Sequence, residues 1–320
     1  MKYRYAISTE KGTRDYNQDR AACLEGNDSV LMILGDGLGG HAGGDIAADI
    51  LVDTASQAFL KIRTPVIEEP SLFLALILQH AHRSINRKAK KSTKKIDPRT
   101  TAVLCLIQNG YAYWAHAGDS RLYLFRNGSQ LTRTLDHTGS DQAKVGGRGI
   151  RIPARTGLYN CIGGPSRPKI ALGPEIALQH GDRILICSDG VWQGMAIDVV
   201  AEYLYEEDDL EDLMDNMLEK IVQRNPEVCD NVTVVSLAWD DKSRPGKRLQ
   251  HEQIRDLTDN DLWRAAREAE KGIRSNTRTG IHAKKQGSRS KAGGNADTAE
   301  SLDSVINEVE SFVKQWEEGK

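Results

Sequence analysis

The 320-residue sequence lacks long hydrophobic runs, and none of its segments approaches the ~20 apolar residues that a membrane helix requires. Its first residues, Met-Lys-Tyr-Arg-Tyr, also lack the apolar stretch of a secretory signal. We therefore expect a cytoplasmic protein without a transmembrane segment.

The sequence also lacks paired cysteines and an excess of charge of one sign. Its five cysteines are scattered and never lie two residues apart, so neither a disulfide framework nor a zinc site is indicated. With 43 Lys and Arg against 45 Asp and Glu, the net charge of −2 does not favour nucleic acid as a partner. The hydrophobic content of 39% is enough for a sizeable core, which excludes a fully disordered chain.

Strand patterns occupy the chain as far as residue 239 and are absent beyond it. The candidates are residues 30–35, 101–108, 111–118, 121–126, 183–188 and 231–239. Two of them are separated by Asn109-Gly110, a dipeptide that supplies the positive φ angles of a tight hairpin. This hairpin predicts antiparallel pairing within a domain that spans residues 1–240.

Apolar residues at helical spacing predict helices over residues 44–60, 71–90 and 208–224. Ser71 is the expected N-cap of the second helix, and acidic residues occupy the first turn of the third. Residues 136–157 are rich in Gly and Arg without a clear period, which predicts a loop.

Residues 241–320 are predicted to form a tail. Residues 271–291 contain seven Lys or Arg and no acidic residue, which is typical of a flexible basic linker. A solvated tether is the simpler interpretation; acidic lipid, nucleic acid or an acidic protein are alternative contacts. Apolar residues from Leu302 to Trp316 recur every three or four positions, which predicts an amphipathic helix over residues 301–317 that packs on the body or on a partner.

Four aspartates border predicted strands: Asp36, Asp119, Asp189 and Asp230. Each alone is compatible with an ordinary turn, because Asp and Gly are common turn residues. Together they would gather negative charge at one rim of the sheets, where cations are needed to neutralise it. Oxygen ligands without neighbouring Cys or His favour Mg²⁺ or Mn²⁺, with Gly37 and Gly190 allowing close backbone approach.

Two such ions can activate water and clamp a phosphoryl oxygen, which favours phosphate-ester hydrolysis by direct attack of water. Arg14 lies in a polar segment near the start of the chain and could bind phosphate through its planar guanidinium. Taken by itself, Arg14 is better explained as an ordinary surface arginine in a loop.

Seven ordered motifs resemble those of the metal-dependent protein phosphatases (PPM family, type 2C serine/threonine phosphatases) in a bacterial-style form. The resemblance covers residues 1 to about 240. The motifs are Arg14-x-x-Asn-Gln-Asp19, Asp36-Gly-Leu-Gly-Gly-His41-x-x-Gly44, Thr100-Thr101-Ala-Val, His116-Ala-Gly-Asp119-Ser-Arg121, Leu131-Thr-x-x-x-Asp136-His137, Gly181-Asp-x-x-Leu-x-Cys-Ser-Asp189-Gly190 and Asp230-Asn231-x-Thr233.

The resemblance implies an α/β (α+β) fold, a four-layer α-β-β-α sandwich with two central antiparallel sheets, and a binuclear Mn²⁺ or Mg²⁺ centre. It implies that Asp36 bridges both ions, that Gly37 offers its carbonyl to one, and that Asp189 and Asp230 complete the other. Asp19 would hold water at the ions, Asp119 matches the aspartate of a third ion in bacterial members, and Arg14 would bind the substrate phosphate. Asn231 would orient its loop.

Three positions depart from the family pattern. Gln18 stands where many members carry an acidic residue, and Gln193 stands where an acidic residue often follows the Asp-Gly-Val-Trp turn. Leu38 occupies the position of the histidine proposed as general acid in eukaryotic relatives. Water at the ions or His41 would then protonate the leaving oxygen, while His41 is equally well explained as a residue at the entry to a helix.

The resemblance therefore implies a serine/threonine protein phosphatase that acts on phosphorylated proteins and opposes a protein kinase. The first alternative is an inactive or weakly active scaffold of the same fold that binds partner proteins. The second is a phosphatase of this fold that acts on one phosphoserine protein in sigma-factor regulation.

Overall fold

The computed structural model describes residues 1–26, 28–39, 42–62, 66–139, 157–224, 226–227 and 229–246. His41, the linker predicted over 271–291 and the helix predicted over 301–317 lie outside the described residues. No helix within the described ranges is long and apolar enough to cross a membrane.

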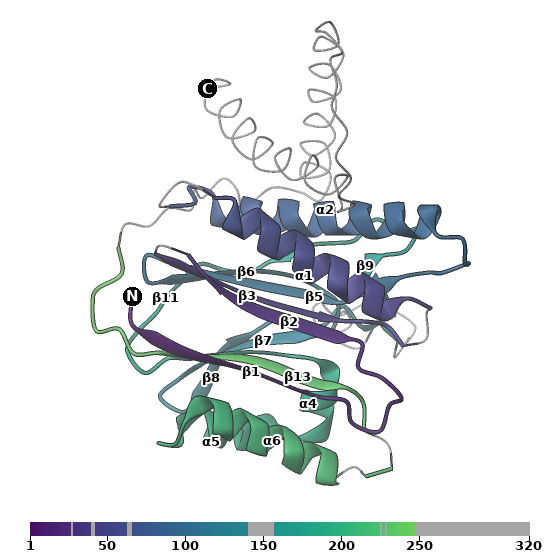
Figure 1. The fold of residues 1–320 in the computed structure, drawn as a ribbon. Coiled ribbons are helices and arrows are strands. Elements are labelled where there is room, and N and C mark those ends of the chain that lie inside the picture. Colours follow the sequence, from purple (N-terminus) through teal and green to yellow (C-terminus); the bar gives the residue numbers. More distant parts are fainter. Residues whose placement is uncertain are drawn as a thin grey trace, which may run out of the picture.

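Two antiparallel sheets lie face to face between two layers of helices (Figure 1). The first sheet has the strand order β1-β13-β12-β7-β8 and the second has the order β10-β6-β5-β3-β2. The strands of the first sheet are β1 (Tyr3–Glu10), β7 (Arg121–Arg126), β8 (Ser129–Arg133), β12 (Arg183–Cys187) and β13 (Val232–Trp239). Those of the second are β2 (Asp19–Glu25), β3 (Ser29–Asp36), β5 (Ala102–Gln108), β6 (Tyr111–Ala117) and β10 (Ala171–Leu172), with β11 (Ile176–Ala177) also pairing with β6. The short strands β4 (Arg99–Thr100) and β9 (Ile162–Gly163) pair with each other.

Helices α1 (Gly44–Leu60) and α2 (Pro70–Lys91) cover the second sheet, whereas α4 (Asp189–Gly194), α5 (Ile197–Tyr205) and α6 (Leu210–Arg224) lie on the side of the first (Figure 1). Three apolar clusters correspond to the three interfaces of this stack. The one between the sheets includes Met32 of β3 and Ile186 of β12, both fully buried. Burial of both faces of each central strand explains why these strands read as continuous apolar runs. The four-layer sandwich expected from the motifs is confirmed.

The Asn109-Gly110 hairpin is confirmed, because Asn109 (φ 54°) and Gly110 (φ 77°) both adopt the positive φ angles that join β5 to β6. Asn127-Gly128 forms a second such turn, between β7 and β8. This turn was not predicted from the sequence. The three predicted helices are present within two residues of their expected bounds. Ser71 is not an N-cap, because Pro70 already occupies the first turn of α2 and Ser71 lies inside the helix.

Strands β1 and β2 were not expected from the sequence. Half of the residues in β1 are exposed, so it lacks an apolar run, and its eight-residue pairing with β13 involves the opposite end of the domain. Helices α4 and α5 were also missed; they contain 6 and 9 residues and are too short for a clear period. Beyond β13, Gly246 still donates its backbone N–H to the oxygen of Asn109 at 2.8 Å. The domain boundary at residue 240 stays a prediction.

Candidate metal-dependent active site

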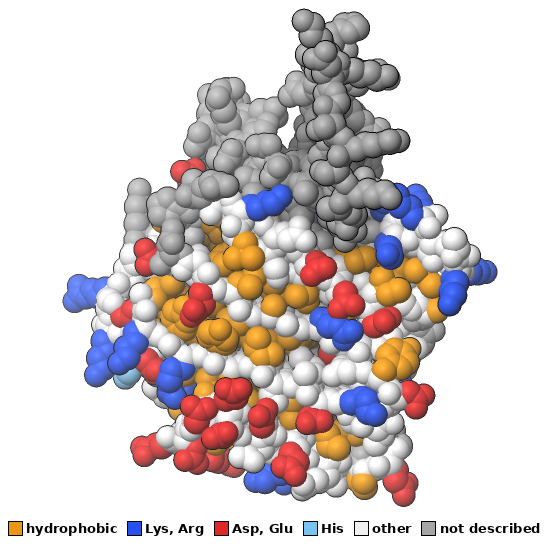
Figure 2. Space-filling view, in the orientation of Figure 1, with side chains coloured by type: hydrophobic (Ala, Val, Ile, Leu, Met, Phe, Trp, Pro, Cys, Tyr) orange, Lys and Arg blue, Asp and Glu red, His pale blue; other side chains and the backbone are white. Residues whose placement is uncertain are grey.

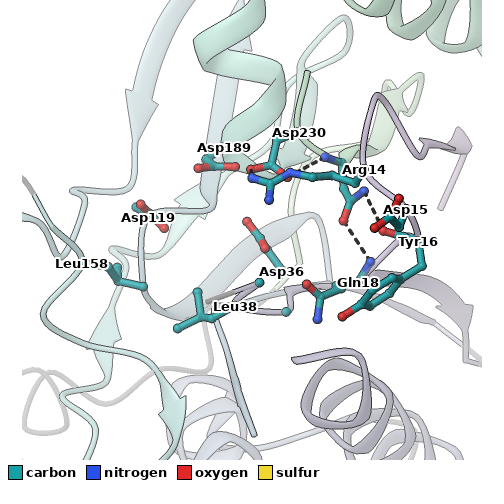
Figure 3. A pocket seen from close by; sticks show the side chains of 13 residues that line it. Arg14, Asp15, Tyr16, Gln18, Asp36, Leu38, Asp119, Leu158, Asp189 and Asp230 are labelled. Carbon is teal, nitrogen blue, oxygen red and sulfur yellow. Dashed lines mark hydrogen bonds and ion pairs between the residues drawn. The ribbon is translucent and has the colours of Figure 1, made fainter. Parts of the chain in front are cut away.

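A cavity of about 400 Å³ opens at one end of the two sheets. Four of the predicted ligands point into it, each at or next to the end of a strand or the start of a helix: Asp36, Asp119, Asp189 and Asp230 (Figure 3). Arg14, Asp15, Tyr16, Leu38 and Leu158 also line it. The structure therefore brings together residues from segments that are far apart in the chain.

Asp19 and Asp36, here called the inner pair, come from neighbouring strands of the second sheet. Asp19 begins β2 and is paired directly with Asp36, the last residue of β3. The backbone of Asp36 is held on its other side, where its N–H donates to Oγ1 of Thr101 at 3.0 Å and its carbonyl accepts the N–H of Thr101 at 2.8 Å. Asp19 is 4% exposed and does not line the cavity; it lies deeper, and neither of its carboxylate oxygens has a hydrogen-bond partner among the described residues.

Gly37 follows the inner pair at a point where two backbones meet. A Cβ on Gly37 would lie 2.5 Å from the carbonyl carbon and oxygen of Gly44, at the start of α1. Because real Cβ atoms do not come that close to backbone, only glycine allows this contact. The predicted glycine thus brings the cavity-lining loop against the first turn of α1.

Asp189 and Asp230, here called the outer pair, come from the first sheet. Ser188 links their segments, since its N–H donates to the oxygen of Thr233 and its Oγ accepts the N–H of Thr233, both at 3.0 Å. Gly190 lies so near that an added Cβ would be 2.3 Å from the oxygen of Asn231. Strands β12 and β13 therefore deliver the two aspartates side by side.

The outer pair, unlike Asp19, has local hydrogen-bond partners. Asp230 accepts Nη2 of Arg14 at 2.6 Å and the N–H of Asn231 at 2.8 Å. Asp189 accepts Nε2 of Gln193 at 2.8 Å, one helical turn along α4. Gln193, noted above as a departure from the family pattern, thus contacts a predicted ligand directly.

Asp119 lies on a turn that is held on both flanks. The N–H of Gly118 donates to Nδ1 of His137 at 3.1 Å, and the indole Nε1 of Trp192 donates to the backbone oxygen of Asp119 at 3.1 Å. Trp192 in turn packs beneath Arg121, whose guanidinium carbon is 3.6 Å from the ring centroid. Trp192 was missed as a supporting residue because its partner is 73 positions away in the sequence.

Asn231 fixes the loop that carries Arg14, as expected. Its Oδ1 accepts the N–H of Gln18 at 2.9 Å, and its Nδ2 donates to the backbone oxygens of Lys11 and Tyr16. The loop is further tied to Cys229, whose oxygen accepts the N–H of Thr13 at 3.0 Å. These bonds place Arg14 over the cavity, where its guanidinium faces Asp230 (Figure 3).

Burial and mutual repulsion raise the pKa values of three of the aspartates, Asp19, Asp36 and Asp189. The pKa of Asp36 lies well above its usual range, because of burial and then of the charges of Asp19, Asp189, Asp119 and Asp230. Burial raises the pKa of Asp19 to about 6, and burial with the charges of Asp119 and Asp230 raises that of Asp189 to about 7. The fold therefore holds carboxylates together at a cost that bound cations would offset.

The donor set fits hard divalent cations. The residues around the cavity offer carboxylate and backbone oxygens, and Asp19 keeps two buried oxygens without partners. Among the described residues, no three His, Cys, Asp or Glu side chains are arranged to enclose one ion by themselves. An ion such as Mg²⁺ retains several waters and takes only one or two protein carboxylates, so it does not require such a group of three.

His41 lies outside the described residues, so its predicted role as general acid stays a prediction. Leu38, noted above as a departure from the pattern of eukaryotic members, lines the cavity. Asp15 also lines it and was not singled out from the sequence; its position next to Arg14 was the available signal.

The four-layer sandwich with an acidic cavity at its strand ends is the architecture expected of a phosphatase with these seven motifs. Residues 11–228 match the family model described as Protein phosphatase 2C, and the chain belongs to that family. It is 26% identical over 241 residues to the serine/threonine phosphatase stp of Listeria monocytogenes, covering 72% of this chain and 94% of that protein. The phosphatase PhpP of Streptococcus pneumoniae is 24% identical over 218 residues, which cover 67% of this chain and 87% of PhpP.

Solved structures show the same fold. The serine/threonine phosphatase of S. agalactiae matches with a TM-score of 0.67 and 24% identity, over 75% of this chain and all of that one. The catalytic domain of the phosphatase PstP, solved with two manganese ions, matches with a TM-score of 0.56 and 25% identity, over 75% of this chain and 99% of that domain. The chain is thus an enzyme, a protein phosphatase of a metal-dependent family.

Proposed function

We propose that this chain hydrolyses phosphoserine and phosphothreonine in proteins, using water activated by two divalent cations, and that it opposes a protein kinase. The observation that carries the proposal is the convergence of four aspartates and Arg14, from both sheets, on one cavity. Relatives named serine/threonine phosphatases support the choice of substrate. No observation among the described residues favours the inactive scaffold.

Asp36, Asp189 and Asp230, with the carbonyl of Gly37, are the proposed holders of two Mn²⁺ or Mg²⁺ ions, and Asp119 is the proposed holder of a third. When bound, such ions lower the pKa of water and neutralise charge on the phosphoryl oxygens. Asp19 adds a second buried negative charge beside Asp36, and its unpaired oxygens suit hydrogen bonds from water that enters with the ions.

Arg14 is the proposed phosphate-binding residue. One of its terminal nitrogens contacts Asp230, and the guanidinium has further donors that can meet phosphate oxygens in the cavity. The bonds from Asn231 hold the loop behind Arg14, so the guanidinium is positioned before substrate arrives. The described residues that line the cavity include no histidine, so we assign protonation of the leaving oxygen to water or to His41.

Hydrolysis of p-nitrophenyl phosphate and of a phosphothreonine peptide tests the proposal. We expect turnover of both with Mn²⁺, its loss with EDTA, and its loss in Asp36→Asn. The matched control is Asp53→Asn, which removes one exposed carboxylate on α1 and should leave turnover unchanged. Wild-type turnover no higher than that of Asp36→Asn would refute the phosphatase function. A phosphoproteome comparison of cells that carry wild type or Asp36→Asn would then identify the substrates and the opposing kinase.

A further inference from the structure

The C-terminal end of α2 and the connector to β4 form a basic surface. Six exposed basic residues lie within nine positions, and no acidic residue interrupts them: Arg87, Lys88, Lys90, Lys91, Lys94 and Lys95. Figure 2 shows Lys and Arg side chains gathered at this end of the molecule, whereas Asp and Glu gather over α5 and α6. We call these six residues the basic connector.

Stabilisation of α2 explains only some of the six basic residues of the connector. Lys88, Lys90 and Lys91 lie in the last turn of α2, where positive charge favours the helix dipole. Lys94 and Lys95 follow the C-cap Ser92 and gain nothing from the dipole. Within the described ranges, the side chains of Arg87, Lys88, Lys90, Lys94 and Lys95 form no ion pair with a carboxylate.

The connector is attached directly to the loop that lines the active-site cavity. The N–H of Asp97 donates to the oxygen of Ala42 at 3.1 Å, and the N–H of Leu38 donates to the oxygen of Arg99 at 3.0 Å. Thr100 is paired with Gly37, a cavity residue. The chain from α2 to β4 therefore ends at the wall of the cavity, at the same end of the molecule as the loop between β1 and β2 (Figure 1).

This attachment limits the distance between the basic charges and the site. Five residues of fully extended chain separate Lys95 from Thr100, which is at most ~18 Å, and the paired strand adds ~5 Å, so Lys95 lies within about 23 Å of Gly37. An extended peptide advances ~3.4 Å per residue. A segment that contacts Lys95, the connector residue nearest to the site in sequence, is thus within about seven residues of the cavity wall at Gly37.

The positive charge of the basic connector favours an acidic peptide segment as its partner. The opposite layer carries six exposed acidic residues around the α5–α6 turn, which would repel such a segment: Glu206, Glu207, Asp208, Asp209, Glu211 and Asp212. The cavity itself contains clustered aspartates, so an acidic substrate needs attraction from another surface.

We propose that the basic connector is a docking surface for an acidic segment of the phosphoprotein substrate, a segment that reaches Lys95 about seven residues from the phosphoresidue. This rests on the proposed phosphatase function. The connector raises the local concentration of acidic substrates and selects among phosphoproteins, while the chemical step uses only the cavity.

The test compares kcat/KM for two phosphothreonine peptides that share a core, one with a run of Glu in its flank and one with Gln at those positions. Wild type should prefer the acidic peptide, and Lys94→Glu/Lys95→Glu should reduce that preference by about fivefold or more, through KM. The matched control Lys220→Glu/Arg224→Glu makes the same charge change on exposed residues of α6 and should keep the preference. Added salt should weaken the preference of wild type.

Hydrolysis of p-nitrophenyl phosphate separates failure of the docking proposal from failure of the proposed function. The Lys94→Glu/Lys95→Glu variant should hydrolyse this small ester as well as wild type does, with an unchanged melting temperature. No preference in wild type, or equal loss in the α6 control, would overturn the docking proposal while the phosphatase function stands. Loss of binding to a fluorescent single-stranded oligonucleotide, with the peptide preference intact, would also overturn it and assign the surface to nucleic acid.

Discussion

The inner and outer pairs of aspartates face the same cavity end of the molecule but are supported in different ways. Asp189 and Asp230 of the outer pair accept hydrogen bonds from Gln193 and from Arg14 and Asn231. Asp19 of the inner pair is buried with no hydrogen bond of normal geometry to its oxygens, although the hydroxyls of Thr233 and Ser188 lower its pKa somewhat, and it lies beside Asp36, whose pKa is raised most clearly. These donors offset only part of the charge of the outer pair, since the pKa of Asp189 is still raised to about 7, and Asp36 carries the clearest electrostatic penalty of the four carboxylates. A site that gathers several incompletely compensated carboxylates attracts cations and lowers the stability of the fold when they are absent.

Replacing the bridging candidate of the inner pair should have the largest effect. We expect Asp36→Asn to lower kcat by at least about a thousandfold, since a ligand that helps hold both ions contributes several kcal/mol to the transition state. Without divalent cations, at pH 8, the same variant should be more stable than wild type by about 1 kcal/mol or more, roughly 2–4 °C in Tm, because a raised pKa makes the ionised form destabilising. Calorimetry in EDTA measures this gain.

The corresponding variant of the outer pair, Asp189→Asn, should gain less metal-free stability, because Gln193 already compensates part of that charge. An equal or larger gain for Asp189→Asn would contradict the distinction between the two pairs.

The next largest effect should follow loss of the guanidinium at the outer pair. We expect Arg14→Ala to reduce kcat/KM for a phosphopeptide by about 10- to 100-fold, which corresponds to one charge-assisted hydrogen bond of ~1.5–3 kcal/mol. Arg14→Lys should recover only part, because an ammonium cannot bind phosphate through two parallel bonds. Steady-state kinetics of both variants test this, and full activity of Arg14→Ala would remove Arg14 from the phosphate site.

The stabilisation by Mn²⁺ should depend on pH. In the metal-free fold the pKa values of Asp19 and Asp189 are about 6 and about 7, so stability from their protonated forms is complete below pH ~4 and is lost as pH rises through 6 and 7. Cations compete with those protons, so the increase in Tm on adding Mn²⁺ should grow from pH 5 to pH 8.

Thermal melts with and without Mn²⁺ at each pH measure this increase in Tm. Protonation of the buried histidines affects both melts alike, so it does not contribute to the increase. An increase in Tm that is independent of pH would show that binding of the ions does not displace protons from Asp19 and Asp189.

The smallest effect should come from the hydrogen bond that supports Asp189. Gln193→Ala should raise the Mn²⁺ concentration for half-maximal activity by a few-fold, with kcat nearly unchanged at saturation. Gln193→Glu places a like charge beside Asp189 and should lower metal-free stability while strengthening Mn²⁺ binding. Metal titrations of activity distinguish these outcomes, and identical titrations for all three proteins would remove Gln193 from the support of the site.

Much of the fold was predictable because its signals are local. The pattern of α1 depends on residues three or four apart, and its bounds, 44–60, agree with the structure. The Asn109-Gly110 turn needs only two positive φ angles. Strand β1 has no comparable local signal; it forms because residues 232–239 offer a partner strand.

The candidate site, like the fold, has residues that local sequence predicts and contacts that it does not predict. Acidic residues at strand boundaries pointed to Asp36, Asp119, Asp189 and Asp230, Arg14 and Gly37 were singled out from their local sequence, and the ordered motifs added Asp19. The sequence did not indicate that Asp19 lies beneath the cavity, that Trp192 supports Asp119 or that Gln193 contacts Asp189. These facts depend on how the two sheets stack.

By itself, the sequence determined which residues carry charge, the position of the longer helices and of the strands that form apolar runs, and the type 2C family pattern, because each of these is encoded within a few neighbouring positions. Only the tertiary structure decided which charges meet. Arg14 and Asp230 are 216 positions apart and come within 2.6 Å because β1 pairs with β13 and Asn231 ties down the connecting loop. The near-neutral whole chain of net charge −2 likewise separates, once folded, into an acidic cavity, an acidic α5–α6 turn and a basic connector. Packing between residues that are distant in the sequence places these acidic and basic side chains on different surfaces.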